Sequence, residues 1–352
     1  MDVPRRLFLH RMTLGLGATL LSACQPNRST PPPPSADAAT PEPTSPGPEG
    51  KRPARPRRAP TPAVSPPPTV DAILGRPTDT SITVNVTMKT DGAWSVEYGT
   101  TPGVFSGETP RRAVTAGIPT EIDVRGLTPD TTYHFRLRSA DLAGAEGTFT
   151  TQRPPGSTFT FAIQGDSHPE RLGRQFDPTL YARTLHAVAA DRPDFYFTIG
   201  DDFSVDTLAH VDAETVGSLY QRQRTFLATV GAPVFLVNGN HEQAALANLN
   251  GTPENVAVWA QTARNRYFPQ PAPDGWYTGD LTPVEHIGLL RDYYAFQWGD
   301  ALFVVIDPYW HSQTTVDNTF GNGREGPKNR DLWEVSIGGT QYQWLRHTLE
   351  TS

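Results

Sequence analysis

The chain has 352 residues, with 30 Lys or Arg against 37 Asp or Glu, so its formal net charge at pH 7 is −7. This length allows two or three domains, and the negative balance gives no general electrostatic basis for binding nucleic acid. No nucleic-acid-binding domain is evident. Cys24 is the single cysteine, which excludes an internal disulfide.

Residues 1–24 are typical of an export signal. Two arginines at positions 5 and 6 precede an apolar run that is too short to span about 30 Å of hydrocarbon, as in a secretory signal of the twin-arginine type. Pro4 and His10 depart from the usual twin-arginine pattern, which leaves the export route open. The stretch LSAC resembles a bacterial lipoprotein box, and this resemblance implies that Cys24 carries a lipid. We therefore expect an exported, extracytoplasmic protein that is anchored to a membrane at Cys24.

Residues 25–69 are rich in Pro, Ser, Thr and Ala and contain almost no large apolar side chain. Such a segment cannot bury a core, so we predict a disordered, largely extended linker. At about 3.1 Å per residue of polyproline II, it can hold a domain well clear of a membrane.

Residues 70–153 show the period of two that is typical of strands. SITVNVTMK alternates Ile82, Val84 and Val86 with polar residues, and WSVEY and TYHFRLRS repeat the pattern between turn residues. This predicts an antiparallel β-sandwich. GLTPDTTYHFRLR resembles the fibronectin type III pattern, with Tyr133 placed to form a tyrosine corner. The fold says little about function: we expect a spacer, with a carbohydrate- or protein-binding module as the alternative.

From residue 156 the pattern changes. FTFAIQGDSH, DFYFTIGDD and VFLVNGNHE are apolar runs that end in Gly and polar side chains, and helical periodicity lies between them. Strands that alternate with helices predict parallel pairing with both sheet faces covered. The carboxyl ends of such strands gather at one edge, where ligands bind. The side chains expected to meet there are Asp166, His168, Asp201, Asp202, Asn240 and His241.

These residue types indicate metal chemistry. Carboxylates and neutral imidazoles suit zinc, manganese or iron, and two such ions about 3.5–4 Å apart can hold a hydroxide and neutralise a phosphoryl group. Gly165, Gly200 and Gly239 permit tight turns and close approach of the backbone.

GDSH, GDDF and GNHE, in this order, resemble the motifs of the calcineurin-like metallophosphoesterases. The stretches YYAFQWGDALFVVID and TQYQWLRHTLE are similar to later landmarks of that family, and the β region resembles the partner domain of purple acid phosphatases. The resemblance implies an α/β/β/α sandwich phosphatase domain over residues 156–352. An all-β, fibronectin III-like sandwich over residues 70–153 would precede it.

The resemblance also implies roles for individual residues. Asp166 and His168 would bind a first metal, Asp201 would bridge the two metals, and Asn240 would bind the second. A hydroxide between the metals would attack the phosphorus of a small-molecule or polymeric phosphoester. His241 would donate a hydrogen bond or a proton to the developing charge.

Asp202 and Glu242 are expected to support the ligands rather than to bind metal. The implied cofactors are two divalent or trivalent ions, with iron, manganese and zinc as candidates. Purple acid phosphatases would have Gly in place of His168 and Tyr in place of Ser204, so we expect no iron–tyrosinate colour band.

The family pattern continues, after the helix of QYQWLRHTLE, with a strand that ends in His and then a Gly-His-x-His block. This sequence stops at Ser352 and lacks those three histidines, so we expect a truncated domain, either a fragment or a short gene product. His311 and His347 lie in a different context and are not expected to replace them. Thr340 and Gln343 predict a capping box at the start of the last helix.

Two other functions stay open. One is a non-catalytic, surface-anchored binding protein or an inactive homologue. The other is a Gly-Asp-Ser esterase with Ser167 as nucleophile, although Asp307 and His311 are one residue too far apart for its Asp-x-x-His pair.

Overall fold

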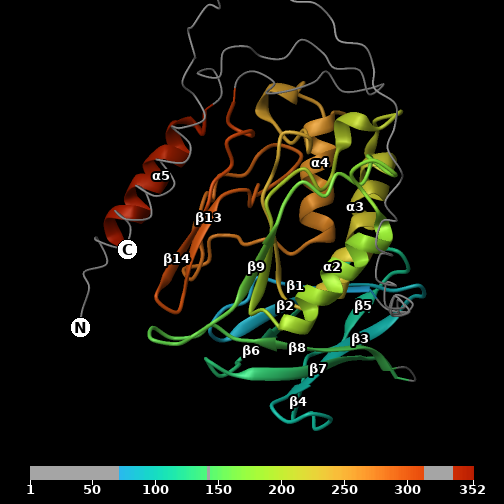
Figure 1. Cartoon of the computed structure of the whole chain (residues 1–352), viewed down its shortest axis with the longest axis vertical. Coiled ribbons are helices and arrows are strands. Elements are labelled where there is room, and N and C mark those ends of the chain that lie inside the picture. Colours follow the sequence, from blue (N-terminus) through green and yellow to red (C-terminus); the bar gives the residue numbers. More distant parts are fainter. Residues whose placement is uncertain (1–70, 141–142, 313–335) are drawn as a thin grey trace, which may run out of the picture. The chain divides into compact units, whose positions relative to one another are not determined.

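The computed structural model describes residues 71–140, 143–312 and 336–352 (Figure 1). The predicted export signal, Cys24 and the Pro-rich linker fall outside the described residues, so these assignments stay predictions. Within the described ranges, no helix has the length and apolar character needed to cross a lipid bilayer.

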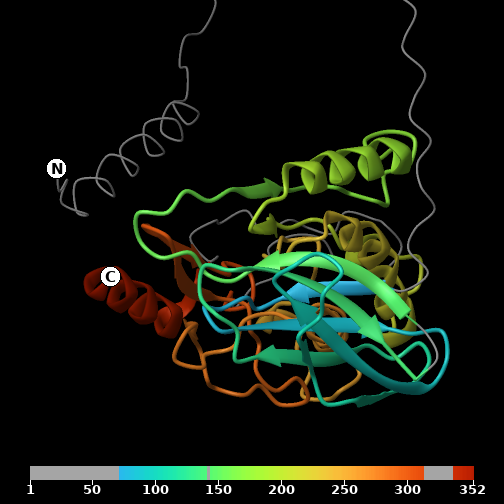
Figure 2. The ribbon, with the colours of Figure 1, turned by 90° about the horizontal axis from the view of Figure 1, so that it is seen from below.

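Residues 71–150 form two antiparallel sheets, seen from below in Figure 2. The strands are β1 (Asp71–Gly75), β2 (Ser81–Thr87), β3 (Gly92–Gly99), β4 (Gly107–Glu108), β5 (Arg112–Val114), β6 (Thr120–Arg125), β7 (Thr132–Arg138) and β8 (Ala143–Thr150). The first sheet has the order β1-β2-β6. The second has the order β4-β3-β7-β8, and β5 pairs with β3.

The alternating apolar residues form the core of this β region. Val84 and Val86 of β2 are buried in one cluster with Val96 of β3. The hydroxyl of Tyr133 accepts a hydrogen bond of 2.9 Å from the backbone N–H of Thr128, a contact to the upstream backbone of the kind that a tyrosine corner makes. The specific likeness to fibronectin type III stays a prediction.

The polar face of β2 is buried as well, which alternation alone did not indicate. Thr83 donates to Oδ1 of Asp123 (2.7 Å), and Asn85 donates from Nδ2 to the backbone carbonyl of Arg266 (3.1 Å). Asn85 is 1% exposed, because the helical layer of the second domain covers this face.

The second domain contains two three-stranded sheets (Figure 1). Aromatic side chains of the two sheets pack together in one buried cluster. One is parallel, with the order β11-β10-β9, and the other is antiparallel, with the order β12-β13-β14. Their bounds are β9 (Phe161–Gln164), β10 (Phe195–Thr198), β11 (Val234–Leu236), β12 (Thr278–Gly279), β13 (Tyr294–Trp298) and β14 (Ala301–Val305).

The expectation that both faces of the parallel sheet are covered is correct for β10 and β11 and wrong for β9. All residues of β10 and β11 are buried, whereas Ile163 of β9 is 56% exposed. Both β9 and β11 end the sheet order β11-β10-β9, and β11 differs because Val234 and Leu236 pack in the helical core while Phe235 packs between the sheets.

Helices lie on the outer faces of both sheets, which gives the expected α/β/β/α order (Figure 1). They are α2 (Pro178–Asp191), α3 (Ala213–Leu227), α4 (Val256–Tyr267) and α5 (Gly338–Thr351), with short 3₁₀ turns η1 (Val205–Thr207), η2 (Ala228–Val230) and η3 (Leu246–Asn248).

Side-chain caps explain where two of these helices begin. Asp177 accepts hydrogen bonds from the backbone N–H groups of Thr179 and Leu180, and Pro178 occupies the first turn of α2. Asp212 caps α3 through a capping box with Thr215.

The capping box predicted for α5 at Thr340 and Gln343 is wrong. The helix begins at Gly338, so Thr340 is its third residue and does not cap it. Gln341 instead faces inward, where its side chain accepts from the backbone N–H of Asp307 (2.8 Å) and donates to the carbonyl of Asp307 (2.9 Å).

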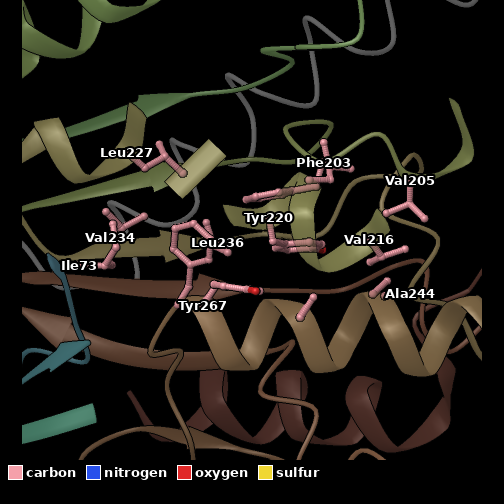
Figure 3. Packing of buried hydrophobic residues seen from close by; sticks show 14 of the residues in the cluster. Ile73, Phe203, Val205, Val216, Tyr220, Leu227, Val234, Leu236, Ala244 and Tyr267 are labelled. Carbon is pink, nitrogen blue, oxygen red and sulfur yellow. The ribbon is translucent and has the colours of Figure 1, made fainter. Parts of the chain in front are cut away.

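A second hydrophobic core lies between the parallel sheet and the helices (Figure 3). The rings of Phe203 and Tyr220 stack with centroids 4.0 Å apart, and Val234 and Leu236 of β11 pack in the same cluster. Ile73 of β1 belongs to this cluster too, so the β-sandwich contributes to the core of the second domain.

Arg224 of α3 adds a polar connection between the two domains. Its guanidinium donates to Oδ1 of Asn85 (2.8 Å) and to the backbone carbonyl of Asn85 (2.7 Å), and it also bonds the carbonyl of Tyr267. The side chain is fully buried, and a buried charge is tolerated only where hydrogen bonds satisfy it. The hydroxyl of Tyr277 donates to the carbonyl of Pro77 (2.6 Å) and makes a further connection.

Candidate metal centre

Three loops meet at the carboxyl ends of β9, β10 and β11, as expected for parallel strands. The first carries Asp166 and His168, the second Asp201, and the third Asn240 and His241. The strand order β11-β10-β9 places the loop of Asp201 in the middle.

Three of these residues have an unusual backbone conformation. The φ angle is 54° at Asp166, 43° at His168 and 57° at Asp201, in the left-handed region that residues with a Cβ seldom adopt. The N–H of Asp166 donates to the carbonyl of Gly200 (3.0 Å), and the N–H of His168 donates to the carbonyl of Asp201 (3.1 Å). Such strain persists where the surrounding structure holds it, and it clusters at functional sites.

Gly200 and Gly239 let the second and third loops touch. A Cβ on Gly200, where φ is 101°, would lie 2.6 Å from the Cα of Gly239. A Cβ on Gly239 would lie 2.2 Å from Oδ1 of Asp201 and 2.8 Å from Oε2 of Glu242. These distances are shorter than any normal contact, so both positions require glycine unless the loops separate.

The donor atoms of His168, Asp201 and His241 lie within 4.8 Å of one another. Oδ2 of Asp201 is 3.7 Å from Nε2 of His168 and 4.0 Å from Nε2 of His241. Oδ1 of Asp166 lies 3.5 Å from Nε2 of His168, and the side chain of Asp166 is 72% exposed. Imidazole nitrogens and carboxylate oxygens at this spacing fit a borderline divalent ion such as zinc, manganese or iron.

Both imidazoles are oriented by carboxylates. Nδ1 of His168 lies 2.8 Å from Oε1 of Glu170, and Nδ1 of His241 lies 2.8 Å from Oδ2 of Asp206. With Nδ1 engaged in this way, each Nε2 faces Asp201. Carboxylate–histidine pairs of this type fix the orientation of metal-binding imidazoles. The hydrogen bond to Asp206 raises the pKa of His241 to about 9, and burial opposes this increase.

Glu242 holds the second and third loops together through their backbone. Its carboxylate accepts from the N–H groups of Asp201 (3.2 Å), Asp202 (3.0 Å), Phe203 (3.1 Å) and Gly239 (2.7 Å). Burial raises the pKa of Glu242 to about 8, although these N–H groups favour the charged form. Glu242 therefore shapes the loops rather than contacting the candidate ligands through their side chains.

Asp202 is fully buried beneath the first loop. It accepts a hydrogen bond from Nε2 of Gln164 (3.2 Å), and Oε1 of Gln164 accepts from the hydroxyls of Tyr196 (2.7 Å) and Tyr181 (3.2 Å). Burial raises the pKa of Asp202 to about 6, and hydrogen bonds from Ser167 and Gln164 oppose the increase.

The contacts of Ser167 do not favour the serine-esterase hypothesis. Its Oγ accepts from Nε2 of Gln223 (2.9 Å), and it also bonds Asp202. Within the described ranges no imidazole bonds this hydroxyl, whereas a serine nucleophile needs a base within hydrogen-bond reach. His311 lies instead 3.6 Å from Oδ2 of Asp292.

Asn240 is half-buried beside His241, and its backbone carbonyl accepts a hydrogen bond from Nε2 of Gln243 (2.9 Å). Its role as a metal ligand stays a prediction. Among the described residues, neither His311 nor His347 joins the group formed by His168, Asp201 and His241.

Sequence reasoning missed three supporting residues. Glu170 and Asp206, which orient the imidazoles, belong to no expected motif. The sequence marks them only as acidic residues that follow a candidate ligand by a few positions. Gln223 had a clearer signal, because it is the polar interruption in the apolar face of α3.

A model of the calcineurin-like phosphoesterase family matches residues 159–347. The chain belongs to this family. The match spans the three ligand loops and reaches α5.

Among solved structures, the calcineurin-like phosphoesterase chain is similar to one described as the structure of PhoD, with 17% identity and a TM-score of 0.53. The alignment covers 81% of this chain and 60% of that one, so the chain spans about three fifths of the length of PhoD and the likeness concerns the fold. No curated protein matches.

Two smaller matches fall on about a quarter of the chain. The sensor domain of the anti-sigma factor RsgI4 of Pseudobacteroides cellulosolvens is 16% identical, and 24% of this chain covers 74% of it with a TM-score of 0.21. The FN5 domain of Drosophila Lar is 20% identical, and 23% of this chain covers 90% of it with a TM-score of 0.19. At these scores neither bears on the fold or the function.

Proposed function

We propose that the chain hydrolyses phosphate esters at a centre of two metal ions held by Asp166, His168, Asp201 and Asn240, with His241 beside them. The observation that carries the proposal is the convergence of donor atoms from His168, Asp201 and His241 within 4.8 Å. Membership of the calcineurin-like phosphoesterase family supports it independently.

When bound, two ions of the iron, manganese or zinc type supply a hydroxide nucleophile and neutralise charge on the phosphoryl group. The residues of the chain hold and orient the reacting groups. The carboxylate of Asp201 lies between the two imidazoles, which suits a ligand shared by two ions. His241, whose Nδ1 is fixed by Asp206, presents Nε2 to the site and would donate a hydrogen bond or a proton to the phosphoryl or leaving oxygen.

The decisive experiment compares Asp201→Asn with His241→Ala on the purified chain, by elemental analysis and by a panel of aryl phosphate monoesters and diesters. Asp201→Asn is expected to lose bound metal and nearly all turnover, because a charge shared by two ions is removed. His241→Ala is expected to keep its metal and lose roughly 10²- to 10⁴-fold in kcat, the range for a general acid.

Asp191→Asn is the matched control, since Asp191 is an exposed carboxylate at the end of α2. Full metal content and turnover in Asp201→Asn would contradict the shared-ligand role. A wild-type chain that binds metal but cleaves no ester on the panel would favour the non-catalytic binding protein.

The segment 1–24 supports a further proposal on location. Its arginine pair, apolar run and LSAC stretch are consistent with export and with lipid attachment at Cys24.

A further inference from the structure

Ser167 lies between two candidate ligands and is held from α3. Its Oγ accepts a hydrogen bond of 2.9 Å from Nε2 of Gln223, and Gln223 is 1% exposed on the inner face of the helix. The flanking residues, Asp166 and His168, both have the left-handed backbone. The side chain of Ser167 therefore anchors the middle of a strained three-residue segment.

The two faces of this segment are held by different groups. Toward β10, the N–H groups of Asp166 and His168 donate to carbonyls of the second loop. Toward the helices, the hydroxyl of Ser167 contacts the amide of Gln223 in α3 and the hydroxyl of Tyr181 in α2. Backbone in a sparsely populated region persists only where its surroundings over-determine it, so both sets of contacts bear on the conformation.

The polar groups below Ser167 fix how it is oriented. Gln164 accepts from two tyrosine hydroxyls through Oε1, so its Nε2 is directed at the buried carboxylate of Asp202. Asp202 also hydrogen-bonds Ser167 from below. The hydroxyl of Ser167 accepts from the amide of Gln223 at 2.9 Å, and it also hydrogen-bonds the hydroxyl of Tyr181.

We infer that Gln223 is a positioning residue: its side-chain amide fixes Ser167 and thereby keeps Asp166 and His168 in the conformation that presents them to metal. The inference rests on the proposed function in taking a metal ion as the species that Asp166 and His168 bind. The effect of Gln223 on the loop conformation does not depend on any ion. Removal of the supporting partners of metal ligands typically weakens metal affinity 10- to 100-fold.

The first test replaces Gln223 with Met, which keeps the length of the side chain and removes the amide. Zinc or manganese titration of the metal-free chain is expected to show affinity at least about 10-fold weaker than that of wild type. Gln221→Met is the matched control, because Gln221 is an exposed glutamine on the same helix. Unchanged affinity in Gln223→Met, with only a lower unfolding midpoint, would mean that the residue is merely structural.

The second test needs no metal. Amide hydrogen exchange of residues 164–169 is expected to be faster in metal-free Gln223→Met than in Gln221→Met, while exchange in α4 stays the same. If the wild-type chain binds no ion, the proposed function fails and this measurement alone decides the positioning role. Equal exchange in the two variants would overturn it.

The third test separates Ser167 from Gln223. Ser167→Ala is expected to match Gln223→Met in both measurements, the double variant is expected to be no worse than either single one, and Ser167→Thr, which keeps the hydroxyl, is expected to recover most of the loss. Should Gln223→Met fail to fold, Ser167→Ala against Ser167→Thr gives the same decision. Additive losses in the double variant would show that the two side chains act separately.

Discussion

Asp166, His168 and Asp201 share a left-handed backbone that costs a residue with a side chain roughly 1–2 kcal/mol relative to the right-handed region. Glycine would remove that cost at each position and would also remove a donor atom. The chain keeps the donors and places true glycines at the adjacent contacts, Gly200 and Gly239. At the scale of single residues, the candidate ligands therefore have a strained backbone, and glycine occupies the positions where the loops touch.

Gly239→Ala tests this arrangement. The new Cβ would lie 2.2 Å from Oδ1 of Asp201 and 2.8 Å from Oε2 of Glu242, so both carboxylates must move. We expect a loss of about 1–3 kcal/mol in the free energy of unfolding, as for other overpacked sites, together with weaker metal binding. Urea unfolding and elemental analysis measure the two effects. Gly339→Ala, whose Cβ would meet no atom within 4 Å, is the control, and equal behaviour of the two variants would contradict the prediction.

The sequence predicted the loops of the centre better than it predicted their supports. Apolar runs ending in Gly and Asp or Asn identify strand ends, so the meeting of His168, Asp201 and His241 followed from parallel pairing. Asp206 orients the imidazole of His241, which lies 35 residues further along the chain, and Glu170 orients that of His168, two residues before it. Side-chain contacts of this kind depend on how a loop turns, which periodicity does not specify.

Among the elements, β2 and α3 differ most from what their patterns predict. Alternation along β2 correctly predicts a strand, but it gives no sign that the polar face, with Asn85, is covered by a helix 139 residues further along the chain. Arg224 and Gln223 in α3 are adjacent buried polar residues with different partners, one in the β-sandwich and one in the ligand loop. This helix therefore contacts both domains.

Arg224→Met is expected to destabilise the chain strongly. It would leave Oδ1 and the backbone carbonyl of Asn85, and the carbonyl of Tyr267, without the guanidinium that they now bond. Each buried group left unsatisfied costs about 1–3 kcal/mol, so we expect a loss of at least about 3 kcal/mol in the free energy of unfolding. Arg222→Met, on the exposed side of α3, is expected to stay within about 0.5 kcal/mol of wild type. Similar urea midpoints for both variants would show that Arg224 makes no net contribution.

At the scale of the molecule, the change from period-two to mixed periodicity near residue 156 falls between β8, the last strand of the β region, and β9, the first strand of the parallel sheet. The sequence predicts the two domains separately and does not predict that they share a core. Ile73 of β1 packs with the helical layer, and the hydroxyl of Tyr277 bonds Pro77 across 200 residues of sequence. Such contacts follow from the fit of two folded surfaces, for which a pattern within either segment carries no signal.

Removal of metal is expected to lower the stability of the chain, because an ion that binds only the folded state stabilises it by mass action. At an ion concentration 100 times the dissociation constant the gain is about 2.7 kcal/mol, which corresponds to a rise in melting temperature of roughly 5–10 °C for a domain of this size. Differential scanning calorimetry with and without a chelator measures the difference. Asp201→Asn is expected to abolish it, since this carboxylate lies between both imidazoles, and Asp191→Asn is expected to leave it unchanged. Elemental analysis could show bound metal in wild type while the chelator leaves the melting temperature unchanged. That result would mean that the ion binds elsewhere than at the three strand ends.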